Sequence, residues 1–339
     1  MNISKSTLLT ALESVKPGLS NKEIIEQTNS FAFMEGRVIT YNDEISISHP
    51  VSELSDITGV IKADELYKIL VKMKEDNLEV DYNDESSELV IKSGRAKAGL
   101  LVQPDIKLPI DEDIKTKGKW KDIPKGFLKF VGFSLTSCAK DMTQPRLTCV
   151  HCSKDGVVES SDNYRITRCT MEEELPIDTF LLPASSAISV VKLNPTKMAQ
   201  GKGWVHFKTE DDTIISCRIL EEEYPNTVPF LKVDGPLLVL PQSLQEALDS
   251  AGVFAKRDTL THETVEITLS NNKITVESKS DTGWYSEALN IKYNKEPISF
   301  AVTPYLLKSI LSETQGCIYG KTKLKFEGEG WVYMSLLKG

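Results

Sequence analysis

The stretch Val157-Val-Glu-Ser-Ser-Asp162 has two counterparts in this chain, Val38-Ile-Thr-Tyr-Asn-Asp43 and Ile274-Thr-Val-Glu-Ser-Lys-Ser-Asp281. Successive closing aspartates are 119 residues apart, and a second alternating stretch follows each of them. Self-similarity at a fixed period indicates a repeated architecture. A period near 120 residues is too long for a solenoid unit and fits one small domain. The sequence therefore predicts three copies of one domain.

Bulk composition agrees with this prediction. The chain has 339 residues, of which 40% are hydrophobic and 26% charged, as in ordinary globular proteins of two or three domains. No apolar run approaches the roughly 20 residues of a membrane helix, and Met1-Asn-Ile-Ser-Lys5 lacks the apolar core of a secretory signal. The six cysteines follow no disulfide spacing, so we expect reduced core residues and a cytoplasmic protein.

Six segments carry apolar residues at helical spacing, two in each third of the chain. They are 2–15, 63–75, 125–140, 184–194, 242–257 and 303–313. The last begins with Thr303 as the expected N-cap and Pro304 at the first helical position. Each domain is therefore expected to contain two helices, about 60 residues apart.

Alternating strands separated by polar turns follow each helix, which is the sequence pattern of a β-hairpin. The clearest pairs are 78–82 with 89–91, 205–207 with 215–219, 265–269 with 274–276, and 324–326 with 332–334. The predicted fold class is α+β, with two helices packed on antiparallel sheet in each domain. Polar segments at 110–122 and 232–236 suggest domains at 1–115, 120–231 and 235–339.

The net charge of −9 argues against nucleic acid on its own, but the charge is unevenly distributed. The six helical segments hold eleven basic and seven acidic residues, a net charge of +4, so the rest of the chain carries −13. Basic helices beside acidic sheets suit a protein that presents one surface to a polyanion. The alternative is that these lysines lie on ordinary solvated helix faces.

Residues that could suggest an enzyme have simpler interpretations. Cys149 and Cys152 lie three apart on an expected strand and point to opposite faces, so no metal site is predicted there. The acidic runs 111–113, 172–174 and 221–223 read as solvated turns and linkers, because adjacent acids do not converge on one ion. The repeated aspartates are expected to form turns. No phosphate-binding glycine loop is present, and no cofactor is expected.

The order of its motifs along the chain, together with the three-fold repeat, resembles the bacterial-type DNA polymerase sliding clamp, the β processivity subunit, over the whole length. The most specific segments are Lys5 to Val15, Val60 to Leu70, Leu89 to Arg95, Glu159 to Ile166, Phe180 to Pro183 and Ser216 to Asn226. The resemblance implies a homodimeric ring of six domains, with helices lining a hole for duplex DNA and sheets outside. It implies a non-catalytic tether that binds the polymerase and the clamp loader through short peptides.

The resemblance also implies site residues. The DNA-binding residues would be Lys22, Lys68, Lys72, Lys125, Lys129, Arg146 and Lys192. The partner-peptide cleft between the second and third domains would use Leu147, Asn163, Tyr164, Arg165, Ile166, Tyr305, Met334 and Leu336. The dimer contact would place Leu100 against Val253 and Phe254 of the other copy.

Two departures from the family fall at this peptide cleft. Asp162-Asn163-Tyr164-Arg165 stands where the family usually has Asp-Gly-His-Arg, and the tail from Val332 lacks the usual Met-Pro-Met-Arg-Leu ending. Peptide specificity is therefore open. Two other functions also remain open at this stage, a metal-dependent nucleic-acid-processing enzyme and a scaffold protein that shares the triplicated domain.

Overall fold

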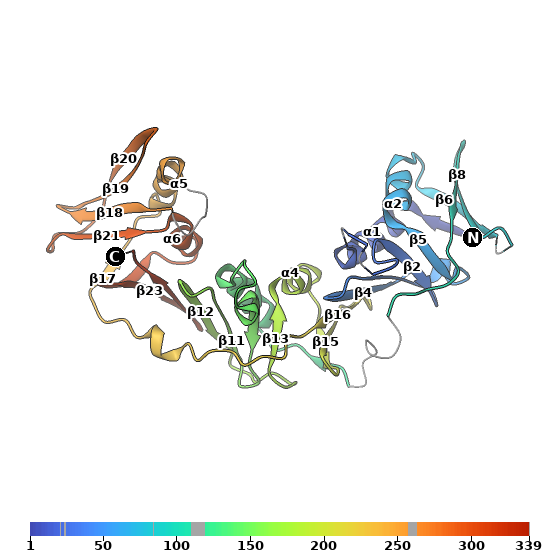
Figure 1. Cartoon of the computed structure of the whole chain (residues 1–339), viewed down its shortest axis with the longest axis horizontal. Helices are drawn as coiled ribbons and strands as arrows, with labels where there is room; N and C mark the ends of the chain where they lie inside the picture. The colour runs from blue at the N-terminus through green and yellow to red at the C-terminus, as the bar shows by residue number, and fades with distance from the viewer. Residues whose placement is uncertain (21, 24, 84, 110–118, 257–262, 339) are drawn as a thin grey trace. The chain divides into compact units, whose positions relative to one another are not determined.

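A computed structural model describes residues 1–20, 22–23, 25–83, 85–109, 119–256 and 263–338. The chain forms two compact units. Figure 1 labels their helices and strands. Unit 1 comprises Met1–Lys129, Ser153–Asp155 and Glu173–Glu222, and unit 2 comprises Phe130–Cys152, Gly156–Glu172 and Glu223–Gly339.

Unit 1 contains helices that alternate with antiparallel strands. Its elements are β1 (Asn2–Ser4), α1 (Lys5–Val15), η1 (Lys16–Gly18), β2 (Ser30–Met34), β3 (Arg37–Tyr41), β4 (Ile45–Pro50), η2 (Ser52–Leu54), β5 (Gly59–Lys62), α2 (Ala63–Lys72), β6 (Asn77–Asn83), β7 (Glu88–Ser93), β8 (Ala96–Leu101), β9 (Lys121–Asp122), β13 (Phe180–Pro183), α4 (Ala184–Leu193), β14 (Lys197–Gln200), β15 (Trp204–Lys208) and β16 (Ile214–Arg218). Its sheets have the orders β1-β6-β7-β8 and β5-β2-β3-β4-β16-β15-β14-β9.

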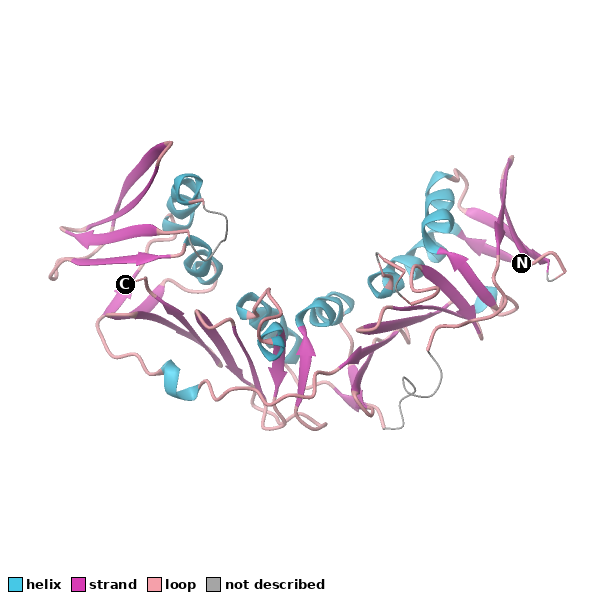
Figure 2. Ribbon diagram, in the orientation of Figure 1, coloured by secondary structure: helices cyan, strands magenta, loops and turns pink. Residues whose placement is uncertain are grey.

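Unit 2 repeats the pattern. Helix α3 (Phe127–Ser134) leads into it, followed by η3 (Leu135–Ser137), η4 (Pro145–Thr148), β10 (Cys149–Cys152), β11 (Val157–Ser161), β12 (Arg165–Thr170), η5 (Val228–Leu231), β17 (Leu237–Val239), α5 (Leu244–Ala255), β18 (Val265–Ser270), β19 (Lys273–Ser280), β20 (Gly283–Asn290), β21 (Ile298–Val302), α6 (Pro304–Leu311), β22 (Gly316–Gly320), β23 (Lys323–Gly328) and β24 (Trp331–Leu336). Its strands run in the orders β10-β11-β12-β24-β23-β22-β17 and β20-β19-β18-β21. In Figure 2 the cyan helices α5 and α6 lie against the magenta strands of this unit.

The predicted helices and hairpins are confirmed. An α-helix begins and ends within each of the six predicted segments. The four predicted strand pairs are the antiparallel hairpins β6–β7, β15–β16, β18–β19 and β23–β24. Between β18 and β19 the turn residues Asn271 and Asn272 have φ of 50° and 58°. Two positive φ values in a two-residue hairpin loop are those of a type I′ turn, which asparagine tolerates.

A buried hydroxyl marks the same position in each repeat. Thr40 on β3 donates a hydrogen bond to the carbonyl of Val15 in α1 at 2.5 Å. Ser160 on β11 does so to Ser134 in α3, and Ser278 on β19 to Ala251 in α5, at 2.5 and 2.7 Å. Val15 and Ser134 are the last residues of their helices, where backbone acceptors lack partners within the helix, and Ala251 lies one turn before the end of α5. These three hydroxyls fix how a helix packs on its sheet in each repeat.

The repeated aspartates all lie in turns between strands, as predicted, but their sequence spacing is one residue out of structural register. The Asp162 carboxylate accepts hydrogen bonds from the backbone of Tyr164 and Arg165, both at 3.0 Å. In the first repeat the residue with this role is Asn42, whose side-chain oxygen accepts from Ile45 N at 3.0 Å. Asp43 instead adopts the left-handed conformation of Asn163, with φ of 48° against 71°.

Other predictions have mixed outcomes. The six cysteines are buried and form no disulfide with one another, as expected for reduced core residues. The first predicted linker falls largely on 110–118, outside the described residues, so the domain boundaries stay a prediction. No helix among the described residues is long and apolar enough to cross a membrane.

Candidate protein-binding and nucleic-acid sites

The junction between β12 and β24 holds most of the predicted peptide-binding residues. Ile166 pairs with Met334 across this junction, and Leu336 N donates to Tyr164 O at 2.7 Å. Because alternate residues of a strand share one face, Ile166, Met334 and Leu336 lie on the same face of the sheet. Ile166 and Met334 are buried, and Leu336 is half-buried. These three side chains form an apolar strip on this face, beside Lys325 and Lys323, which pair with Met334 and Leu336.

Arg165 and Tyr305 lie on the other face of the same junction. The predicted cleft residues are therefore split between the two faces of the sheet and do not line one cleft. The guanidinium carbon of Arg165 lies 4.9 Å from the centre of the Tyr305 ring, a cation–π distance. Arg165 Nε donates to Asp162 Oδ2 at 2.9 Å, with both side chains largely buried. The Tyr333 hydroxyl donates to the carbonyl of Leu306 in α6 at 2.7 Å. This network holds the start of α6 against β12 and β24.

Burial dominates the electrostatics of this network. It raises the pKa of Asp162 although the Arg165 charge opposes the shift. It also raises the pKa of Tyr305, with Asp162 adding to the effect. Removing one partner of a buried ion pair destabilises a protein strongly, because the other charge stays buried without compensation. We therefore assign Arg165 and Asp162 a structural role in holding the junction.

The segment from Tyr224 to Leu231 is anchored to the apolar face by a second polar network. Glu159, which is 4% exposed, accepts from His151 Nδ1 at 2.9 Å, Arg168 at 2.7 Å and the Thr227 hydroxyl at 2.5 Å. The His151 ring stacks on the Tyr224 ring, with centroids 4.8 Å apart. These three donors keep the pKa of Glu159 low although burial opposes the shift.

Sequence reasoning missed two apolar residues that this anchoring presents. Val228 and Phe230 of η5 are 52% and 54% exposed, and η5 contacts β24. Lys323 Nζ donates to Phe230 O at 3.1 Å and lies 5.8 Å from the centre of its ring, while Lys323 pairs with Leu336. The run Val228-Pro-Phe-Leu231 after three glutamates was the available sequence signal. Apolar side chains left exposed beside a buried apolar face are typical of a binding surface.

The remaining predicted cleft residues lie around this junction. Leu147 is buried in η4, and Asn163 is at the left-handed position of the β11–β12 turn. Tyr164 is 47% exposed beside the end of β24.

The predicted DNA-binding lysines are all on the surface, at helices or their ends. Lys68 and Lys72 lie on α2 opposite its buried Leu66 and Leu70, and Lys68 pairs with Asp64 of the same helix at 2.5 Å. Lys192 lies in the last turn of α4. Lys129 lies in α3, Lys125 in the turn before it, Arg146 in η4 and Lys22 in a loop. Lys72, Lys125, Lys129 and Lys192 form no ion pair with any described residue.

The charge excess on the helices is smaller than predicted. Within the observed bounds the six helices hold six basic and five acidic residues. The observed helices are shorter than the predicted segments, so Lys125, Lys140 and Lys256 fall in flanking turns. Helix α5 carries Glu246 and Asp249 and no base. Net positive charge therefore remains only on α3, α4 and α6, with one basic residue each, while α1 and α2 are balanced.

Of the predicted dimer contacts, Leu100 lies on an edge strand, and Val253 and Phe254 lie on helix α5. Leu100 is half-buried on β8, the last strand of its sheet, and pairs only with β7 among the described strands. Val253 is 60% exposed on α5. The neighbouring Phe254 ring covers Gly283 of β20, where an added Cβ would lie 2.7 Å from a ring carbon. Strand β20 likewise pairs only with β19 among the described strands.

The Cys149 and Cys152 segment forms strand β10, as predicted, and its His151 serves the Glu159 network. No group of three or more potential metal ligands occurs among the residues described above. His206 is fully buried on β15, and its Nδ1 lies 2.8 Å from the Ser216 hydroxyl. His262 lies outside the described residues.

Comparison with solved structures places this chain in a known fold. Over 100% of its length it superposes on a DNA polymerase III subunit beta from Pseudomonas aeruginosa, with TM-score 0.82, 14% identity and 99% of that chain covered. A DNA polymerase sliding clamp from Bacillus subtilis gives 0.82, 18% identity and 98% coverage. A putative DNA polymerase III beta subunit from Eubacterium rectale gives 0.84, 16% identity and 99% coverage. The chain therefore has the α+β fold of these proteins along its whole length.

No protein-family model matches the sequence, and no curated protein matches it. The likeness is one of structure at low sequence identity, as expected for a divergent chain.

Proposed function

We propose that this chain is a DNA sliding clamp, in which two copies close head to tail around duplex DNA and tether a replicative polymerase without catalysis. The observation that carries the proposal is a pattern of strand pairing. Strands β4 and β16 pair at one repeat boundary, and β12 and β24 pair at the next. The strands that would make the third such pair, β20 and β8, end their own sheets.

The two observed junctions dictate how β20 would meet β8 of a second copy. At these junctions Ile47 pairs with Ile215, and Thr167 pairs with Tyr333. Ile47 and Thr167 are the cross-strand partners of the buried hydroxyl residues Thr40 and Ser160. The residue in β20 with the same relation to Ser278 is Tyr285.

On the other side of the junction, Ala98 is the counterpart of Tyr333. Both hairpins have two-residue turns, with Ser93 pairing with Ala96 and Gly328 with Trp331. The inferred register therefore pairs Tyr285 with Ala98 of the second copy and, two residues along, Gly283 with its Leu100. Leu100 then meets the Phe254 ring that covers Gly283. The register therefore supports the contact of Leu100 with Phe254 that the resemblance implies.

Closure of the ring would also cover the two strand edges that the isolated chain exposes. Unpaired strand edges expose backbone donors and acceptors and promote uncontrolled association. Two identical β20–β8 junctions in a two-fold dimer cover both edges and end the assembly at two copies. The result is a ring of six domains, for which we propose the bounds 1–115, 120–231 and 235–339.

The surface lysines support DNA as the ligand of the ring. Phosphate attraction from Lys22, Lys68, Lys72, Lys125, Lys129, Arg146 and Lys192 would be independent of sequence and screened by salt, as sliding requires. The polymerase and the clamp loader would bind through short peptides at the apolar face of Ile166, Met334, Leu336 and Phe230. Tethering raises the effective concentration of the polymerase at the primer end without new chemistry. A cytoplasmic location belongs to the same proposal.

The ring is tested by locking it shut. In the inferred register Glu287 lies opposite Ala96 of the second copy, so a chain carrying Glu287→Cys and Ala96→Cys should form two intermolecular disulfides. We expect the oxidised dimer, assembled in the presence of nicked circular plasmid, to stay on the circle in high salt and to leave when the plasmid is cut once.

Each single-cysteine variant is the matched control and should be washed off the circle by salt. A wild-type chain that sediments as a monomer of 37.8 kDa at micromolar concentration, together with no cross-linked dimer, would contradict the clamp. Those results would favour the scaffold alternative.

A further inference from the structure

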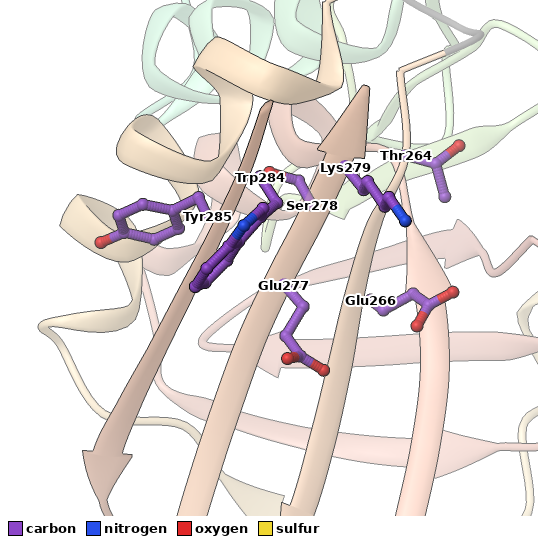
Figure 3. A pocket seen from close by; sticks show the side chains of 7 residues that line it. All are labelled: Thr264, Glu266, Glu277, Ser278, Lys279, Trp284 and Tyr285. Atoms are coloured by element: carbon purple, nitrogen blue, oxygen red, sulfur yellow. The ribbon is translucent and has the colours of Figure 1, made fainter. Parts of the chain in front are cut away.

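A pocket of about 450 Å3 lies on the sheet of β18, β19 and β20, close to the free edge of β20. The side chains that line it are drawn in Figure 3: Thr264, Glu266, Glu277, Ser278, Lys279, Trp284 and Tyr285. Trp284 is 70% exposed and belongs to the edge strand itself. The pocket is therefore an open site beside an edge strand.

Two carboxylates oppose each other in this pocket. Glu266 of β18 and Glu277 of β19 are direct cross-strand partners, and both are exposed. Like charges placed directly opposite destabilise a sheet. The Ser286 hydroxyl donates to Glu277 at 3.0 Å, and Lys279 pairs across from Trp284. One lysine beside two glutamates leaves the pocket with a net negative charge.

The other free edge carries the opposite arrangement. Lys92 of β7 and Lys97 of β8 are direct cross-strand partners, and both are exposed. Lys92 lies 3.9 Å from Glu79 on its other side. Lys97 forms no ion pair within the described part of the chain. Two like-charge pairs of opposite sign thus lie near the two edges that closure would join.

The register inferred for ring closure brings these pairs together. Pairing Tyr285 with Ala98 places Ser286 opposite Lys97 of the second copy and Trp284 opposite its Gly99. Ser286 is also the cross-strand partner of Glu277, so the small serine stands between the lysine and this glutamate. Neighbouring strands lie about 4.8 Å apart, so a lysine side chain can extend over Ser286 to the Glu277 carboxylate.

We propose that this pocket is the receptor for Lys97 of a second copy, whose ammonium group enters between Trp284 and Glu277 and neutralises the Glu266–Glu277 pair. The inference rests on the ring proposed above and adds the residues that make its closure selective. Trp284 contributes its ring face to the ammonium and packs over Gly99, which has no side chain to obstruct it. Complementary like-charge pairs also disfavour joining two copies by identical edges, β8 to β8 or β20 to β20.

The test is a charge-reversal cycle measured by analytical ultracentrifugation of the full chain at low salt. Lys97→Glu and Glu277→Lys should each weaken each junction about fivefold, and because a ring has two junctions the dimer dissociation constant should rise about 25-fold. The double variant, which restores opposite charges at both junctions, should recover most of this loss. The gap between single and double variants should shrink as salt screens the pair.

The matched control is Lys202→Glu, an equal charge change at an exposed turn in unit 1. It should leave the dissociation constant within about twofold of wild type. If the wild type dimerises but both single variants match this control, or if the double variant is as weak as the singles combined, the pocket assignment is wrong while the ring stands. If the wild type itself is a monomer, the ring is wrong and the pocket assignment is wrong with it.

Discussion

At the residue scale the chain is built around a few buried polar groups whose positions recur. Thr40, Ser160 and Ser278 each donate to a carbonyl near the end of a helix. The sequence showed these residues only as the middles of three similar phrases. It could not reveal the bonded carbonyls, because the helix that supplies each one is about 25 residues earlier in the chain. A hydrogen bond between a hydroxyl and a carbonyl this far apart in the chain produces no local sequence pattern.

His206 is the residue-scale source of a predicted acid sensitivity. Burial lowers the pKa of its imidazole from 6.5 to about 4. Between pH 6.5 and pH 4 the His206 imidazole binds a proton in the unfolded chain but not in the folded chain. The stability that the neutral histidine contributes is therefore complete above pH 6.5 and is lost as the pH falls toward 4. The loss should reach about 3 kcal/mol over this window.

Urea unfolding of the wild type and of His206→Gln at pH 7 and pH 4.5 measures this loss. The wild type should lose about 2 to 3 kcal/mol more than the variant, because glutamine does not titrate while the carboxylates shared by both chains do so equally. Equal losses in the two chains would show that His206 takes up its proton without unfolding.

At the element scale the sequence predicted more than it did for single residues. The four hairpins and six helices were readable because their periodicities are local. The faces of the β12–β24 junction were not, because residues such as Arg165 and Ile166 are adjacent in sequence and point to opposite sides of the sheet. The spacing of the repeated aspartates also differs from the structural repeat by one residue. In the first turn Asn42, and not Asp43, accepts the backbone hydrogen bond that Asp162 accepts in the second turn.

The anchored segment that carries η5 gives an element-scale prediction. Thr227→Val removes the hydroxyl that donates to Glu159 while preserving side-chain shape. A hydrogen bond to a buried carboxylate contributes about 1.5 to 3 kcal/mol, so this segment should loosen from the sheet. The affinity of a short apolar peptide from a polymerase tail should fall about tenfold by calorimetry, because Phe230 would no longer be held beside Leu336.

Hydrogen exchange distinguishes this cause from general destabilisation. In Thr227→Val the amides of 226–231 should exchange faster while those of β18 and β19 stay protected. Thr170→Val, at an exposed position on β12, is the control and should change neither measurement. Unchanged peptide affinity in Thr227→Val, despite faster exchange, would move the peptide site away from η5.

At the scale of the whole molecule, the fold was predictable from the sequence, while the distribution of charge was predicted only in part. The predicted segment 125–140 was longer than the observed helix, so it counted Lys125 and Lys140 as helical although α3 begins at Phe127 and ends at Ser134. The basic surface is consequently narrower than expected, while helix α5 is acidic. Helix ends depend on capping and tertiary contacts, so their bounds are the least reliable part of a sequence-based estimate.

Closure of the ring gives the last prediction, and Leu100 is the residue on which it depends most directly. In the inferred register this half-buried side chain becomes fully buried against Gly283 and Phe254 of the second copy. Leu100→Ala should then cost about 2 kcal/mol at each junction by the usual cost of large-to-small core changes. Two junctions double the cost to about 4 kcal/mol, which raises the dimer dissociation constant about a thousandfold.

Sedimentation across a dilution series measures this shift, and Val239→Ala supplies the control, because Val239 is an exposed apolar residue (65%) on a different sheet edge. The effect of Leu100→Ala should persist at high salt, since it comes from apolar burial, whereas the effect of Lys97→Glu should fade. This difference in salt response distinguishes the apolar contact of Leu100 from the ionic contact of Lys97. A Leu100→Ala dimer as tight as that of Val239→Ala would mean that β8 meets a different strand, and the pairing of β20 with β8 would have to be abandoned.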